Sequence, residues 1–100
     1  MGMQFYPRIG SGDDVEFPAT DLVVSFTYGN ADLVLKAIGH RGLDEDTYFV
    51  EFDPTFLADA CRKVIYNGSI RDGEILRRVL MLRELADEAI QNGWPAIQGA

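Results

Sequence analysis

The chain has 100 residues, of which 16 are acidic and 9 are basic, so its formal net charge is −7. Hydrophobic residues make up 47% of the sequence and charged residues 25%, a composition that excludes a disordered tail, a collagen-like chain and a disulfide scaffold. The acidic balance excludes a sequence-independent grip on nucleic-acid phosphates, and the apolar runs are too short to cross a bilayer.

The first part of the chain predicts short strands. One is expected over residues 3–6, ended by Pro7, and another over residues 15–17. The glycines and aspartates of segment 10–14 are typical of turns, so these two strands are expected to form an edge hairpin. Residues 21–28 predict a better strand, because apolar and polar side chains alternate along them.

The middle of the chain predicts a helix, a strand and a second helix. Asn30 is a fair N-cap for a short helix over residues 31–38. Alternation over residues 47–52 predicts the next strand. Asp53 is then expected to cap a helix that begins with Pro54, where the missing N–H of proline costs nothing.

A long third helix is predicted over residues 70–91, with Ser69 as its cap and Gly93 just beyond its end. Its apolar stripe is wider than the arc of about 100° that one packing surface needs. We therefore expect this helix to contact two surfaces. They are either the sheet and the second helix of the same chain, or a second subunit placed against the flank of Met81 and Leu85.

Together these elements predict one α+β domain over residues 1–100. We expect a two-layer sandwich in which a small sheet of three to four strands carries two to three helices on one face. The strands at 21–28 and 47–52 are joined through a helix, which favours a parallel arrangement with a right-handed crossover. The other face is expected to be open, with Phe49 exposed on it. After the long helix, Trp94 is expected to fold back onto the body.

The sequence contains no assembled catalytic motif. His40 is the only histidine, which excludes a histidine-rich metal site, and no nucleophile elbow or phosphate-binding loop is present. His40 is expected to be a solvated loop residue, and Cys61 a buried, unreactive thiol. We therefore predict a protein that is not an enzyme, without catalytic residues, bound metal or cofactor. The first residues do not resemble a signal peptide, so a cytoplasmic location is expected.

The net charge is concentrated in one half of the chain. Residues 1–53 contain ten acidic and three basic side chains, whereas residues 54–100 contain six of each. We therefore expect an acidic surface around the sheet and its loops, which would attract a basic partner or else only keep the protein dispersed. The residues expected to bind a partner are Asp13, Asp14, Glu16, Asp44, Glu45, Asp46 and Glu51.

Three hypotheses follow from these patterns. The first is a small, acidic, non-enzymatic interaction module of the inhibitor or immunity type, which blocks a basic, nucleic-acid-binding surface of a protein partner and itself contacts neither nucleic acid nor membrane. The second is a homodimeric structural or accessory protein assembled through helix 70–91, with Met81, Leu85 and Phe49 at the interface. The third is a small metal-binding protein or enzyme that uses the carboxylates of its two acidic loops to hold Mg²⁺ or Ca²⁺.

Overall fold

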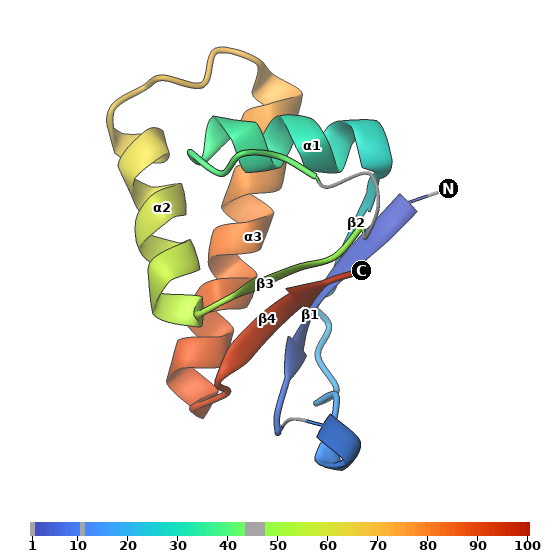
Figure 1. Cartoon of the computed structure of the whole chain (residues 1–100). Coiled ribbons are helices and arrows are strands. Elements are labelled where there is room, and N and C mark those ends of the chain that lie inside the picture. Colours follow the sequence, from blue (N-terminus) through green and yellow to red (C-terminus); the bar gives the residue numbers. More distant parts are fainter. Residues whose placement is uncertain (1, 11, 44–47) are drawn as a thin grey trace.

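The computed structural model describes residues 2–10, 12–43 and 48–100. Four strands form one antiparallel sheet in the order β2-β1-β4-β3, and three α-helices cover one of its faces (Figure 1). The two-layer α+β sandwich is therefore confirmed. In chain order the elements are β1 (Gly2–Arg8), the 3₁₀ turn η1 (Gly12–Asp14), β2 (Val24–Thr27), α1 (Tyr28–Ala37), β3 (Val50–Phe52), α2 (Pro54–Tyr66), α3 (Gly73–Asn92) and β4 (Ala96–Gly99).

The strand β4 is the main feature that the sequence analysis did not predict. It lies between β1 and β3, so the end of the chain forms an inner strand of the sheet (Figure 1). Gly99 fits there because a Cβ atom at this position would stand 2.7 Å from the Phe5 ring and 2.8 Å from a Val50 methyl group. Trp94 packs against the core, as expected.

The predicted parallel pair of strands is wrong. β2 and β3 lie at opposite edges of the sheet, and the three antiparallel pairings between them make these two strands run in opposite directions. The helix between them therefore does not make a right-handed crossover to a neighbouring parallel strand. The direction of β3 is instead fixed by β4, which has no counterpart in the predicted sheet.

The strand boundaries also differ from the predicted ones. β1 continues through Pro7, which lies beyond the last residue of β1 that pairs with β2. Instead of a full hairpin, the next segment makes a single bridge, in which the backbone N–H groups and carbonyls of Ile9 and Glu16 exchange bonds of 2.8 and 2.9 Å. β3 begins only at Val50, because the φ of 46° at Tyr48 takes the preceding backbone out of the extended region.

The helix caps combine two confirmed predictions with two corrections. Asp53 caps α2 as expected, because its Oδ1 accepts bonds of 2.8 and 3.3 Å from the first free N–H groups of the helix. α1 is capped by the hydroxyl of Thr27, and Asn30 donates its backbone N–H to that oxygen. α3 is capped by Asp72 rather than Ser69, so the helix starts three residues later than predicted. Gly93 ends α3 in the left-handed conformation, as expected.

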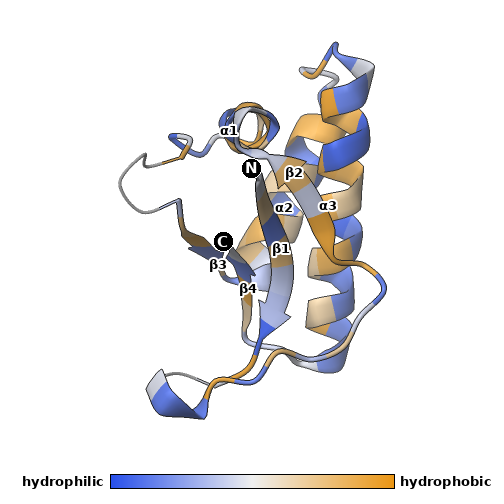
Figure 2. Cartoon of the chain, turned by 90° about the vertical axis from the view of Figure 1, so that its right-hand side faces the viewer, coloured by the Kyte–Doolittle hydropathy of each residue, from blue (hydrophilic) through white to orange (hydrophobic). Residues whose placement is uncertain are grey.

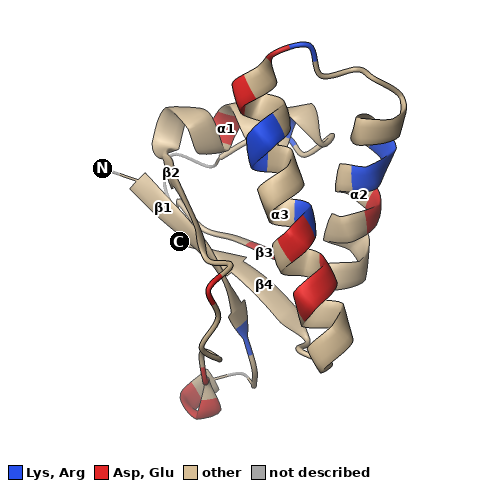
Figure 3. Ribbon diagram, turned by 180° about the vertical axis from the view of Figure 1, so that it is seen from behind, with Lys and Arg blue, Asp and Glu red and all other residues tan. Residues whose placement is uncertain are grey.

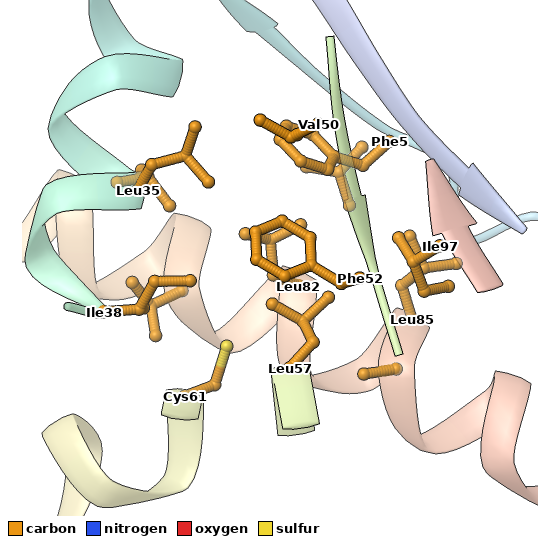
Figure 4. Packing of buried hydrophobic residues seen from close by; sticks show 14 of the residues in the cluster. Phe5, Leu35, Ile38, Val50, Phe52, Leu57, Cys61, Leu82, Leu85 and Ile97 are labelled. Carbon is orange, nitrogen blue, oxygen red and sulfur yellow. The ribbon is translucent and has the colours of Figure 1, made fainter. Parts of the chain in front are cut away.

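The core lies between the sheet and the helices. Side chains from α1, α2 and α3 meet those of the inner sheet face, as Phe5, Leu35, Leu57 and Leu82 illustrate (Figure 4). α3 contacts α2, α1 and three strands, which accounts for its wide apolar stripe without a second subunit. None of the helices in the described ranges is both long and apolar enough to span a bilayer.

Candidate functional site

The open face of the sheet is the side that carries no helix (Figure 2). Strand alternation sends Phe5 and its neighbours into the core and sends every second residue of β1 to this face. The pairing register then places polar side chains from the other strands beside them. The polar residues gathered here are Gln4, Tyr6, Arg8, Ser25, Glu51 and Gln98.

Three contacts hold this polar row together, one of which is the bond of 3.4 Å that the Gln4 side-chain amide donates to the Ser25 hydroxyl. Gln98 donates its side-chain N–H to the Tyr6 hydroxyl at 2.8 Å, and Arg8 makes an ion pair with Glu51 at 2.7 Å. Only 18% of the Arg8 side chain is exposed, so this pair is shielded from water more than most surface pairs. Glu51 was predicted to face a partner, but its charge is already balanced by Arg8. It therefore contributes little to an acidic surface.

A shallow apolar groove lies beside the polar row. Phe17 meets the Tyr6 ring edge to face, with 5.2 Å between the ring centroids, and 55% of Phe17 stays exposed. Val23, just before β2, is 39% exposed on the same side. The sequence indicated a strand at Phe17 but not this contact, which brings together residues separated by a turn. The groove is lined by Gln4, Tyr6, Phe17, Pro18, Ala19, Thr20 and Val23.

Four of the ten acidic residues of the first half lie on the segment that builds this groove. We call the described residues 9, 10 and 12–22 the acidic arm; it leaves β1, turns at η1 and returns to β2, with η1 standing beyond the end of the sheet (Figures 1 and 3). Asp13 and Asp14 lie exposed in η1, and Glu16 and Asp21 are exposed further along. None of these four carboxylates makes an ion pair with any residue in the described ranges.

The helical side has a different charge arrangement (Figure 3). Glu74 pairs with Arg77 and Arg78 at 3.1 and 3.3 Å, and Arg62 joins α2 to Asp87 of α3. These are exposed contacts of small individual strength, yet they balance neighbouring charges of opposite sign. Glu84 and Glu88 are acidic residues of α3 without an ion pair within the part of the chain that the structure describes. They therefore provide matched controls for the carboxylates of the acidic arm.

The second predicted acidic cluster, Asp44, Glu45 and Asp46, lies outside the described residues. The loop that leads to it is held at Asp32, whose Oδ1 accepts the backbone N–H of Leu43 at 2.9 Å and whose Oδ2 lies 2.8 Å from Lys36. The bond from Lys36, and then the one from Leu43, lower the pKa of Asp32 below its usual value. Asp32 is therefore a structural carboxylate that fixes the loop to α1.

The two residues considered as candidates for chemistry, His40 and Cys61, both pack against other parts of the chain. His40 was expected to be solvated, but it is half-buried: its Nδ1 accepts the N–H of Gly42 at 3.2 Å, and its ring meets Phe52 edge to face at 5.4 Å. Cys61 is buried in the core, and burial raises the pKa of its thiol to about 12, as expected of an unreactive cysteine. Within the described ranges, no three His, Cys, Asp or Glu side chains are arranged to hold a metal ion.

The candidate dimer residues are not brought together on one surface. Leu85 is completely buried by this chain's own core, so it has no exposed area to offer a second subunit. Met81, on the same helix, is half-buried against the core, with its sulfur 3.8 Å from an Arg77 guanidinium nitrogen. Phe49 is 43% exposed and lies just before β3, on the sheet side of the molecule.

Comparison with protein-family models, with curated proteins and with solved structures finds no significant match for this chain.

Proposed function

We propose that the chain is a non-enzymatic protein-interaction module that docks its acidic arm on a basic surface of another protein. The observation that carries the proposal is the contrast between the two sides of the molecule. Four exposed carboxylates of the arm make no ion pair among the described residues, whereas most acidic residues of the helical side are paired or cap a helix. Charges that the fold leaves uncompensated remain available to a partner.

Electrostatics gives such a surface a role in encounter. Unpaired like charges on one projecting segment produce a field that extends about 10 Å at an ionic strength of 0.1 M. That field speeds association with a basic surface and disfavours acidic ones. A basic surface that normally binds nucleic-acid phosphates is the kind that carboxylates can cover, so we place the protein among inhibitors or immunity-type partners.

The proposal is tested by affinity capture from the native host with three forms of the protein. The arm variant is Asp13→Asn with Asp14→Asn, and the control variant is Glu84→Gln with Glu88→Gln, which removes the same charge from α3. We expect a partner recovered by the wild type and the control but lost, or strongly reduced, with the arm variant. Equal recovery by all three forms would contradict the proposal.

The two other hypotheses have less support. The core of this chain buries Leu85 completely, so Leu85 cannot contribute to dimerisation through α3, and α3 also packs against α2, α1 and the sheet. A carboxylate metal site has no three-ligand cluster in the described ranges. We further propose a cytoplasmic location, because the chain has a single cysteine, Cys61, and therefore none of the intrachain disulfides that are common in small secreted domains.

A further inference from the structure

We infer that the groove between the acidic arm and β1 receives an aromatic side chain of the partner, flanked there by lysine or arginine. This inference rests on the proposed function and adds to it the chemistry of the segment that binds. It concerns the groove of Tyr6, Phe17, Pro18 and Val23, which faces solvent on the open side of the sheet.

The groove has apolar surface that the chain itself leaves uncovered. Among the residues that line it, Tyr6 is half-buried, while Phe17 and Val23 remain 55% and 39% exposed. Large apolar side chains exposed next to one another are typical of places where another molecule packs. The Phe17 ring already sits edge to face on Tyr6, so a third ring entering the groove would find aromatic and proline surfaces in the favoured geometry.

The acidic residues near the groove favour basic residues on either side of the partner's aromatic side chain. None of the acidic residues lines the groove itself, but Glu16 directly precedes Phe17, and Asp21 lies between the lining residues Thr20 and Val23. Lysine and arginine on either side of the incoming ring would meet these carboxylates. The occupant is therefore a basic segment with an aromatic anchor.

A second groove of this chain combines an exposed phenylalanine with basic side chains. It lies between α1 and α2, where Phe56 is 65% exposed, and its rim carries Lys36 and Lys63. The sign of this rim is opposite to that of the acidic arm, so a basic segment would avoid it. Phe56 thus provides a matched control for Phe17, since both are exposed phenylalanines beside a groove.

The test uses two blocked peptides, Lys-Arg-Trp-Arg-Lys and Lys-Arg-Gly-Arg-Lys, titrated into the isotope-labelled protein by NMR. We expect the tryptophan peptide to bind about threefold to tenfold more tightly than the glycine peptide, with shifts centred on Tyr6, Phe17 and Val23. Phe17→Ser should remove this preference, whereas Phe56→Ser should preserve it. Both variants replace exposed rings, and their circular dichroism spectra establish that each remains folded.

The results separate the groove from the acidic arm. Asp13→Asn with Asp14→Asn should weaken both peptides to the same extent and leave the preference for tryptophan intact. Equal binding of the two peptides to the wild type, or a preference that survives Phe17→Ser, would overturn the inference about the groove. If instead the tryptophan preference persists but neither the arm variant nor added salt weakens binding, the proposed function is overturned, and with it the basic flank.

Discussion

Gly99 gives the sharpest test of the inner position of β4. An alanine there would place its Cβ 2.7 Å from the Phe5 ring and 2.8 Å from Val50, both below the closest normal approach. Phe5 is fully buried, so its ring cannot move aside without disturbing the core. Overpacking of this kind costs about 1–3 kcal/mol of the free energy of unfolding.

For a domain of this size each kcal/mol lowers the Tm by about 4–8 °C, so Gly99→Ala should melt clearly below the wild type in thermal denaturation followed by circular dichroism. Gly73→Ala is the matched control, because a Cβ at Gly73 meets no atom within 4 Å and the residue begins α3. We expect that control to melt at or above the wild-type temperature. Equal Tm values for the two variants would refute the placement of Gly99 between Phe5 and Val50.

Three further outcomes are expected. Asp72→Ala should lower the free energy of unfolding in urea by about 1 kcal/mol because it removes the cap of α3, while Ser69→Ala should change it by less than about 0.5 kcal/mol; the reverse order would assign the cap to Ser69. Cys61 should resist alkylation at pH 8 in the folded protein and react once the protein is unfolded, since burial keeps it protonated. Because the folded pKa of Cys61 is about 12 against an ordinary 9.0, its contribution favours folding below pH 9 and is lost as the pH rises toward 12. Cys61→Ala should therefore lose less stability than the wild type in urea titrations between these pH values, and identical pH profiles would contradict the assignment.

Local signals were enough to predict α2 and the general layers. Asp53 caps α2 and Pro54 is its first residue, so these two adjacent residues define where the helix begins without any distant contact. The long α3 was also evident from its periodicity, although its cap was misplaced because both Ser69 and Asp72 are good capping residues. The structure selects Asp72, whose carboxylate reaches two N–H groups of the first turn.

Contacts between residues far apart in the chain could not be predicted from local sequence patterns. β4 has four residues, one of them glycine, and its partner β1 lies at the other end of the chain, as the bond from Gln98 to Tyr6 illustrates. For the same reason Glu51 was counted as a free acid, although Arg8, 43 residues away, balances it. The net charge by position did place Asp13 and Asp14 on one exposed segment, but the groove beside them depends on the packing of Phe17 on Tyr6.

The most direct test of the central claim is the association rate constant with the captured partner, measured by stopped flow between 0.1 and 1 M salt. Over this range the Debye length falls from about 10 Å to about 3 Å, so steering by the acidic arm should be largely screened. We expect the wild type and the Glu84→Gln, Glu88→Gln control to associate at least about tenfold more slowly at high salt. The Asp13→Asn, Asp14→Asn variant should start slower and change less. A rate constant that is independent of salt, or an arm variant that matches the control throughout, would contradict the account.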